Sequence, residues 1–253
     1  MKKNTLTGVV IARNEEEMIG ECLESLSFCD SILVVDNNSS DNTSKIAKKK
    51  GAKVVFADSH DFSRLRNFAL DKMSSDYVLY LDADERVSKD LASEILSVLA
   101  DKIDVGAFFI PRQNYYFGNH LWPKNERLER LFKKSALKEW RGILHESPVV
   151  VGPIGELHNP IFHYTHRNLS SMVAKTNEWS LKEAELRLQA NHPPVSWWRF
   201  PRIMLSAFLQ SYIKQQGYKA GYIGIIESIY QAFSMFITYA KLWELQQQKV
   251  VKE

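Results

Sequence analysis

The stretch YVLYLDADERV, at residues 77–87, decides the fold. Its first five residues form an apolar run of strand length, which is typical of a strand buried on both faces of a parallel sheet. Residues two apart in an extended chain share a face, so Asp82 and Asp84 can direct both carboxylates to one point. Two neighbouring carboxylates repel each other, and a divalent cation relieves that repulsion. The stretch therefore predicts a strand end that binds Mg²⁺ or Mn²⁺ together with phosphate oxygens.

Two other interpretations of this stretch stay open. The aspartates can simply cap the helix that is expected to begin near Ser88. An aspartate pair after an apolar strand also occurs in haloacid-dehalogenase-like phosphatases, in which Asp82 would be the nucleophile. That pattern has a threonine or valine where this chain has Arg86, and it places the pair on an early strand.

Three further apolar runs of strand length precede this stretch, and amphipathic stretches separate them. The runs span residues 6–12, 31–36 and 53–57, and the amphipathic stretches span residues 15–26 and 62–73. This alternation predicts right-handed βαβ units with helices on both faces of the sheet. Ligands bind such sheets at the carboxyl ends of the strands. Those ends are polar here, because Arg13 to Glu15 follow the first run and Asp36 to Asp41 end the second.

Length and composition agree with a globular enzyme. The chain has 253 residues, of which 45% are hydrophobic and 25% charged, so disordered, collagen-like and fully membrane-embedded classes are excluded. A net charge of +3 does not indicate a nucleic-acid partner. Cys22 and Cys29 are too few for a disulfide scaffold, and no secretory signal is evident at the start of the sequence. We therefore expect reduced thiols and a cytoplasmic protein.

Three motifs together resemble a known family. VVIARNEEEMIGECLESL (residues 9–26), ILVVDNNSSDNT (32–43) and YVLYLDADERV follow one another at the spacing of the family 2 glycosyltransferases, and the resemblance covers about the first 165 residues. It implies the GT-A fold, a Rossmann-like mixed sheet flanked by helices, in a catalytic domain at residues 1–167. It also implies an inverting transfer from a nucleotide-sugar donor, with Mg²⁺ or Mn²⁺ as cofactor.

The resemblance assigns roles to the polar strand ends. Asp84 would be the direct metal ligand, with Asp82 near the ribose and metal and His163 as a further ligand. Contacts to the donor are implied for Ala12, Arg13, Asn14, Glu15, Asp36, Arg64, Arg66, Asn67 and Asp82. A solvent-exposed helix face is the alternative for Arg64 and Arg66. Asp41 is expected to be the N-cap of the next helix rather than a ligand.

An inverting transfer needs a base that takes the proton of the acceptor hydroxyl. The segment EWRGILHESP resembles the region in which the family places this base, so Glu146 is the candidate and His145 would orient it or touch the acceptor. An ordinary His-Glu pair at a strand end is the alternative, and Glu85 is the next candidate for the base.

The segment between the aspartates and Glu146 is rich in aromatic and basic side chains. They are Tyr115, Tyr116, Phe117, Trp122, Lys124, Arg127, Arg130, Lys133, Lys134, Lys138 and Arg141. Aromatic faces suit sugar rings and cations suit phosphate, so we expect an anionic acceptor. A solvated pair of strands is the alternative.

Residues 168–253 are expected to be helical. No acidic residue occurs between Glu185 and Glu227, whereas five basic residues there are interspersed with aromatic ones. This composition predicts a segment that lies on an anionic bilayer surface. Glu227 and Gln231 interrupt the longest uncharged run, so no transmembrane span is expected. Packing against the catalytic domain or a second copy of the chain is the alternative.

The whole layout, including GYKAGYIG and YAKLWE, resembles the lipopolysaccharide core glycosyltransferases of Gram-negative bacteria, in particular the β-1,4-glucosyltransferases. This resemblance implies UDP-glucose as donor, a phosphorylated heptose on a lipid-linked saccharide as acceptor, and a position on the inner face of the inner membrane. A glycosyltransferase for another bacterial surface glycan and a non-catalytic sugar-binding protein are the alternatives. The intact acids Asp82, Asp84 and Glu146 argue against the latter.

Overall fold

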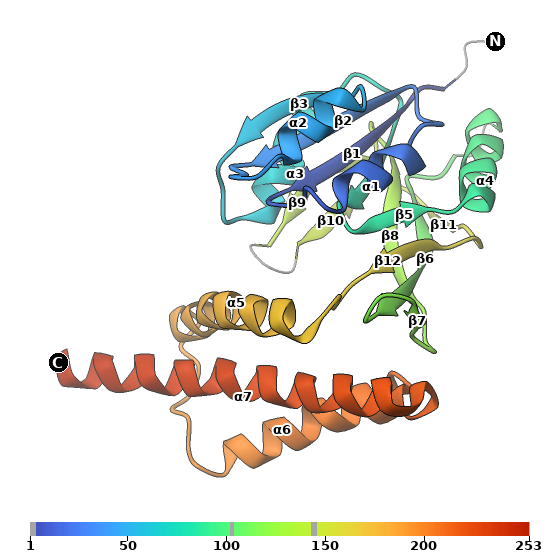
Figure 1. The fold of residues 1–253 in the computed structure, drawn as a ribbon. Helices are drawn as coiled ribbons and strands as arrows, with labels where there is room; N and C mark the ends of the chain where they lie inside the picture. Colours follow the sequence, from blue (N-terminus) through green and yellow to red (C-terminus); the bar gives the residue numbers. More distant parts are fainter. Residues whose placement is uncertain (1–3, 102–103, 143–145, 253) are drawn as a thin grey trace. The chain divides into compact units, whose positions relative to one another are not determined.

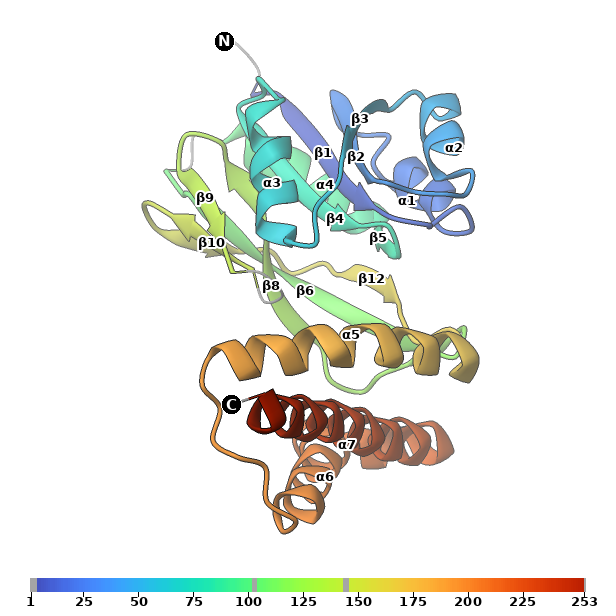
Figure 2. The same ribbon diagram turned by 90° about the vertical axis from the view of Figure 1, so that its left-hand side faces the viewer.

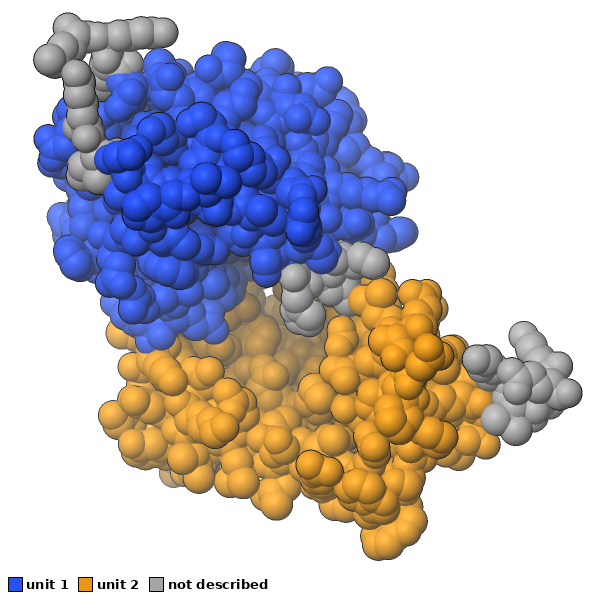
Figure 3. All heavy atoms as spheres, turned by 180° about the vertical axis from the view of Figure 1, so that it is seen from behind, with its two compact units in different colours: residues 1–113, 125–163 blue, residues 114–124, 164–253 orange. Residues whose placement is uncertain are grey.

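The structure of the protein is a computed structural model that describes residues 4–101, 104–142 and 146–252. It divides the chain into two compact units, which Figure 3 colours separately. Unit 1 comprises residues 1–113 and 125–163, and unit 2 comprises residues 114–124 and 164–253. The segment 114–124 thus groups with the C-terminal helices, although it lies well before residue 167 in the sequence.

Unit 1 is built on a mixed sheet with four parallel strands at one side (Figures 1 and 2). These are β1 (Leu6–Ala12), β2 (Ser31–Asn37), β3 (Lys53–Ala57) and β4 (Tyr77–Asp82). β1 pairs in parallel with both β2 and β4, and β2 pairs with β3. The four predicted strands are confirmed, with β2 one residue longer than expected.

The rest of the sheet is formed by later strands, in the overall order β3-β2-β1-β4-β8-β6-β12-β5. β8 (Glu126–Lys133) is antiparallel to β4 and to β6 (Ala107–Tyr116), and β12 (Ile161–Tyr164) is antiparallel to β5 (Glu85–Val87). The short strands β7 (His120–Leu121) and β11 (Ile154–Glu156) also pair with β6, whereas β9 (Leu137–Arg141) and β10 (Ser147–Val150) form a separate hairpin. The predicted mixed α/β fold is confirmed.

Helices cover both faces of the parallel strands. Three of them, α1 (Ile19–Ser25), α2 (Thr43–Lys49) and α4 (Lys89–Ala100), pack on one face, and α3 (Phe62–Asp71) packs on the other with Trp140 of β9. The strands alternate accordingly, since Val10 of β1 faces the first core and Val9 faces the second. Each buried aliphatic side chain stabilises the fold, and truncating one such as Leu79 to alanine costs about 2–5 kcal/mol.

Side-chain caps mark the starts of α3, α4 and the C-terminal helix that begins at Leu169. Asp61 accepts hydrogen bonds from the first N–H groups of α3, and Ser88 accepts one from Leu91 at the start of α4, as expected. α1 begins four residues later than predicted because Glu15 to Met18 form a turn. The N-cap of α2 is Asn42, so the prediction of Asp41 was wrong by one residue, although the Asp41 carboxylate accepts the N–H of Thr43.

Unit 2 consists mainly of three helices, α5 (Leu169–Gln189), α6 (Arg199–Leu209) and α7 (Gly221–Lys252), as Figure 1 shows. α7 packs against both α5 and α6 around Ala184, Val195, Tyr239 and Leu242. A π-helical turn (Gln210–Lys214) and a 3₁₀ turn (Gly217–Ala220) connect α6 to α7. Contrary to the expectation from the sequence, residues Gly217–Gln248 are long and apolar enough to cross a membrane, by length and composition alone.

Candidate active site

The order of the strands locates the candidate site. The chain runs from β1 to β2 and β3 on one side and then returns to β4 on the other side of β1. At such a switch point the loops after two adjacent parallel strands diverge and leave room for a ligand. Asp82 ends β4 at this point, and Asp84 lies in the turn between β4 and β5. Arg86, which is buried, shapes that turn because its guanidinium donates to the carbonyl groups of Ala83, Glu85 and Met18.

Asp82 lies between two arginines. Its Oδ1 accepts a 3.1 Å hydrogen bond from Arg66, and its Oδ2 accepts a 2.6 Å hydrogen bond from Arg130. Burial alone would raise the pKa of this carboxyl, but the charges of Arg130 and Arg66 outweigh burial and hold the pKa well below its usual range. Asp82 is therefore ionised at any physiological pH, and it is fixed in place by charged partners.

Glu85 belongs to the same network and is wholly buried. Its Oε1 accepts hydrogen bonds from Arg130 at 2.8 Å and from Arg112 at 3.0 Å, and its Oε2 accepts the N–H of Asp82 at 3.0 Å. Burial alone would lower the pKa of Arg130, but the charges of Asp82 and Glu85 outweigh burial and raise this pKa above its usual value. The earlier interpretation of Glu85 as an alternative base is wrong, because this carboxylate is inaccessible and already paired.

Arg66 joins Asp82 to Glu146. The Nε and Nη2 atoms of Arg66 each lie 3.0 Å from Oε1 of Glu146, so both carboxylates contact one guanidinium. The guanidinium stacks over the ring of Trp140 at 4.7 Å and is almost fully buried. Its Nη1 has no hydrogen-bond partner among the residues that the structure describes. This atom is itself buried, so the guanidinium contributes its charge to the site while its hydrogen bonds go to Asp82 and Glu146.

The other predicted residues of α3 do not share this position. Arg64 is 80% exposed and pairs with Asp61 on the helix surface, which supports the alternative interpretation for this residue. The side-chain amide of Asn67 exchanges hydrogen bonds with the N–H and carbonyl of Trp140, so both ends of this amide bind the protein itself. Asn67 thereby holds β9 against α3. His145 lies outside the described residues.

Asp84 and His163 come together from different strands. The antiparallel pairing of β12 with β5 sets His163 opposite Glu85, and His163 Nε2 lies 3.4 Å from Asp84 Oδ2. A carboxylate oxygen and an imidazole nitrogen suit Mn²⁺, and the carboxylate also suits Mg²⁺. Among the described residues no group of three His, Cys, Asp or Glu side chains is placed to hold a metal. The donor set therefore fits a metal whose remaining ligands are water and substrate oxygens.

The loops after β1 and β2 bind each other. Asn14, in a left-handed conformation that asparagine tolerates, accepts the N–H of Ser40 and donates its own N–H to Ser39. The Asp36 carboxylate is buried and accepts hydrogen bonds from the N–H of Ser39 and the hydroxyl of Ser44. The N–H of Glu15 donates to Thr43 across the same junction. These hydrogen bonds join the loop after β1 to the loop after β2. The contacts to the donor that were expected for Asp36 and for Ala12 to Glu15 stay predictions.

The basic residues of the central segment do not form the single patch that the sequence suggested. Arg130 is buried beneath Asp82, Arg127 pairs with Glu156, and Arg141 pairs with Glu139. Sequence analysis did not identify the role of Arg130, although the sequence offers an indication. Arg130 lies two residues from both Leu128 and Phe132 in β8, and a buried arginine in a strand needs an acidic partner. Arg112 of β6 was missed as well, because nothing near it in the sequence indicates Glu85.

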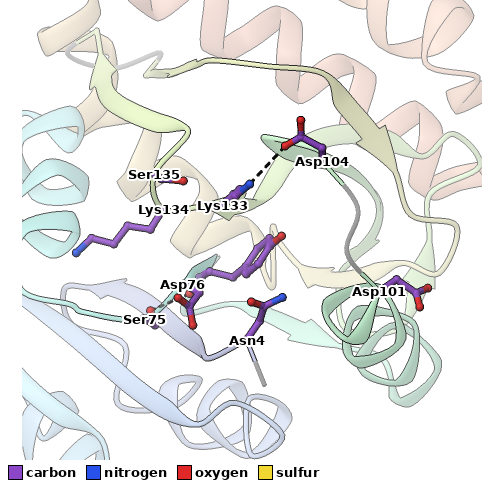
Figure 4. A pocket seen from close by; sticks show the side chains of 9 residues that line it. Asn4, Ser75, Asp76, Asp101, Asp104, Lys133, Lys134 and Ser135 are labelled. Carbon is purple, nitrogen blue, oxygen red and sulfur yellow. Dashed lines mark hydrogen bonds and ion pairs between the residues drawn. The ribbon is translucent and has the colours of Figure 1, made fainter. Parts of the chain in front are cut away.

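A pocket of about 520 Å³ lies at the opposite end of the parallel strands (Figure 4). Asn4 and Asp76, which precede β1 and β4, line it together with Lys133 and Lys134 at the end of β8. Asp76 is engaged by the N–H and hydroxyl of Thr5, and Lys133 lies 3.5 Å from Asp104. This pocket lies at the amino ends of the strands, away from the carboxylates that end β4, so it is not the candidate active site.

Comparison with known proteins identifies the relatives of this chain. It is 26% identical to the lipopolysaccharide core biosynthesis glycosyltransferase LpsC of Rhizobium meliloti (strain 1021), over 96% of this chain and 93% of that protein. It is 30% identical to an uncharacterised glycosyltransferase of Rickettsia typhi, over 97% of this chain and 88% of that protein. Both alignments extend through the C-terminal helices.

Among solved structures, similarity extends to two sugar transferases. The mannosyl-3-phosphoglycerate synthase of Rubrobacter xylanophilus aligns over 76% of this chain and 77% of its own, with 17% identity and a TM-score of 0.49. The glucosyl-3-phosphoglycerate synthase of Mycobacterium tuberculosis, solved with Mn²⁺ and UDP, aligns over 75% and 81%, with 16% identity and a TM-score of 0.47. The model of the family described as glycosyl transferase family 2 matches residues 7–153, which include Asp82, Asp84, Arg66 and Glu146. The chain belongs to glycosyl transferase family 2.

Proposed function

We propose that this protein is an inverting, metal-dependent glycosyltransferase that moves a hexose from a nucleotide-diphosphate donor, UDP-glucose, to a saccharide hydroxyl. The observation that supports this most directly is the single guanidinium of Arg66 that contacts both Asp82 and Glu146 at the carboxyl end of β4. It puts a buried cation for the donor diphosphate beside a carboxylate that can accept a proton. An inverting transfer requires a donor site and a base that lie close together. Here Arg66 contacts a residue of each.

In the proposed reaction Glu146 accepts the proton of the acceptor hydroxyl. The acceptor oxygen forms a bond to the anomeric carbon of the sugar while the bond from that carbon to the diphosphate oxygen breaks, so the configuration inverts and the nucleoside diphosphate leaves. Arg66, which is as buried as Arg130, orients Asp82 and Glu146 and supplies a positive charge beneath the diphosphate site. Arg130 and Glu85 hold Asp82 in position but remain too buried to touch a substrate.

Asp84 and His163 are the residues that would hold a divalent metal, with Asp82 beside them. When bound, the metal would offset the negative charge that develops on the departing diphosphate. Asp82 is already paired with two arginines, so we assign it to positioning and donor contact more than to metal binding.

For the acceptor we propose the heptose of a lipopolysaccharide inner core. The relative from Rhizobium meliloti is named for lipopolysaccharide core biosynthesis, and it aligns with this chain over nearly its whole length. Surface glycans of other types are the second possibility within the same reaction class, and the acceptor assay separates them.

The experiment is a donor screen followed by an acceptor screen. The protein is incubated with Mn²⁺ and UDP-glucose, UDP-galactose or GDP-mannose, and release of the nucleoside diphosphate is measured with and without purified lipopolysaccharide core that lacks its hexoses. We expect release with UDP-glucose, stimulated by the core acceptor, and a mass gain of one hexose on that acceptor. Transfer from another donor would overturn the assignment of UDP-glucose but leave the reaction class intact.

A phosphatase reaction makes a different prediction. A haloacid-dehalogenase-like enzyme would form a covalent phosphate on Asp82, which mass spectrometry detects after incubation with a phosphoester. We expect none, because both oxygens of Asp82 are held by Arg66 and Arg130.

A further inference from the structure

The outward side of α7 is apolar along most of its length. Its exposed hydrophobic side chains recur at helical spacing, so they form one stripe, here called the α7 stripe: Tyr222, Ile225, Ile226, Ile229, Phe233, Phe236 and Trp243. Tyr222 is 86% exposed. Large contiguous apolar surfaces are rare on proteins that face only water, and they mark contact with another phase or another protein.

The opposite side of α7 faces the inside of unit 2 and carries buried polar groups beside its apolar core residues. Glu227 is only 1% exposed and accepts hydrogen bonds from Gln231 and contacts His166 Nδ1 at 2.9 Å. Ser228 donates to Ser211, and the Tyr230 hydroxyl contacts Thr176 of α5. The buried polar groups of α7 are thus satisfied inside unit 2, beside the apolar core formed with Tyr239 and Leu242, while a row of apolar side chains is left exposed.

A second exposed stripe lies on α6 and continues into the π-helical turn. Arg202, Leu205, Leu209 and Ile213 follow one another at intervals of three or four residues, and all four are exposed. Just before this helix Trp197 is 80% exposed, and the guanidinium groups of Arg199 and Arg202 lie over the ring of Trp198. Exposed tryptophans beside arginines are typical of the boundary between lipid headgroups and acyl chains.

Between residues 186 and 226, which include α6 and the start of α7, the charge has one sign. Exposed Arg202, Lys214 and Lys219 lie between residues 186 and 226, where the sequence contains no acid. Two copies of this surface would place like charges together, which disfavours a symmetric dimer. An anionic lipid surface complements both the cations and the apolar side chains.

We propose that the α6 and α7 stripes of unit 2 bind the surface of an anionic lipid bilayer, with α7 lying in the plane of the membrane rather than crossing it. A crossing helix would expose Glu227 to the hydrocarbon and would break its packing on α5 and α6. The inference does not depend on the proposed reaction, because it rests on unit 2 alone.

The test uses the full-length protein and vesicles of phosphatidylcholine with or without phosphatidylglycerol, separated by sedimentation. We expect binding to the anionic vesicles that weakens as salt is raised, and weak binding to neutral ones. The variant Arg202→Gln/Lys214→Gln/Lys219→Gln should bind the anionic vesicles about 100-fold more weakly, since each basic residue near such a surface contributes roughly 5-fold.

A second variant, Ile225→Ser/Ile229→Ser/Phe233→Ser, removes the apolar stripe and should not bind either type of vesicle. Its matched control, Phe56→Ser/Leu96→Ser/Val151→Ser, removes three exposed apolar side chains of unit 1 and should bind like the parent. Circular dichroism checks that each variant is folded. Binding by the Ile225 variant equal to that of the parent would overturn the proposal.

Two further outcomes would also overturn it. The first outcome is a parent that is a dimer in solution and an Ile225 variant that is a monomer, with no vesicle binding by either protein. The α7 stripe would then be a contact between copies of the chain. If protein from cell membranes resists extraction with alkaline carbonate, α7 crosses the bilayer. Loss of vesicle binding with normal release of nucleoside diphosphate would separate this inference from the proposed function.

Discussion

The Glu146 carboxylate lies 3.0 Å from Arg66 Nε, although the two residues are 80 positions apart in the chain. The contact joins the middle of α3 to the segment after β9, and Trp140 holds the guanidinium in place. Glu146 is therefore paired with a cation in the donor-free protein. We expect this contact to fix the orientation of the Glu146 carboxylate before the acceptor arrives.

Arg66 should be essential for transfer, whereas Arg64 on the same helix should not. Arg66→Gln removes the buried positive charge that holds both Asp82 and Glu146, so turnover should fall about 10²-fold or more. Arg64→Gln, which changes an exposed arginine two residues away, should leave turnover near normal. Steady-state release of nucleoside diphosphate measures both. Equal losses in the two variants would contradict the site described here.

Glu146→Gln keeps the shape of the side chain but cannot accept a proton. Turnover should fall about 10²-fold or more, while the dissociation constant for UDP, measured by calorimetry, should change little. The control is Glu139→Gln, which alters an exposed glutamate of the neighbouring strand β9. Near-normal turnover of the Glu146 variant would place the base elsewhere.

The pair Asp84 and His163 should determine metal binding. Asp84→Asn and His163→Ala should each weaken the binding of Mn²⁺ in the presence of UDP, which electron paramagnetic resonance of the free ion measures directly. Asp90→Asn changes an exposed aspartate six residues later and serves as the control. Unchanged Mn²⁺ binding in both site variants would show that the metal is held by other groups.

Arg130 should matter for stability more than any exposed arginine. Arg130→Met removes the shared partner of the wholly buried Glu85 and the partly exposed Asp82, so the free energy of unfolding should fall by about 3–5 kcal/mol. Arg127→Met, on the same strand but in a surface pair with Glu156, should cost less than about 1 kcal/mol. Urea denaturation compares the two. Similar losses would mean that the buried network contributes little.

The two thiols should be unreactive in the folded protein. Burial raises the pKa of Cys22 far above that of a free thiol, and burial together with the neighbouring charge of Asp30 raises the pKa of Cys29 to about 12. Both groups therefore stay protonated between pH 7 and 9, where free thiols begin to ionise. Labelling with a disulfide reagent at pH 8.5 should be slow in buffer and rapid in urea. Fast labelling of a single thiol in buffer would identify an exposed cysteine.

The sequence alone determined the parallel half of the fold and the position of the chemistry within it. Runs such as Tyr77 to Leu81 are apolar, of strand length and bounded by polar residues, so the strands and their ends can be recognised from the local sequence. Asp82 and Asp84 could be placed at the strand ends for the same reason, and the three motifs sufficed to indicate the family that the comparison later confirmed.

Only the tertiary structure decided which charges meet. Arg130 and Glu85 are 45 residues apart and Arg112 and Glu85 are 27 apart, so no local pattern links them, and sequence analysis counted Arg130 as a surface cation. The same holds for Arg64 and Arg66, which look equivalent until α3 turns one toward Asp82 and the other toward solvent. In α7 the sequence indicated that Glu227 interrupts an apolar run, whereas packing on α5 and α6 turns Glu227 inward and the apolar stripe outward. Local periodicity reports which residues share a face; only long-range pairing determines what that face meets.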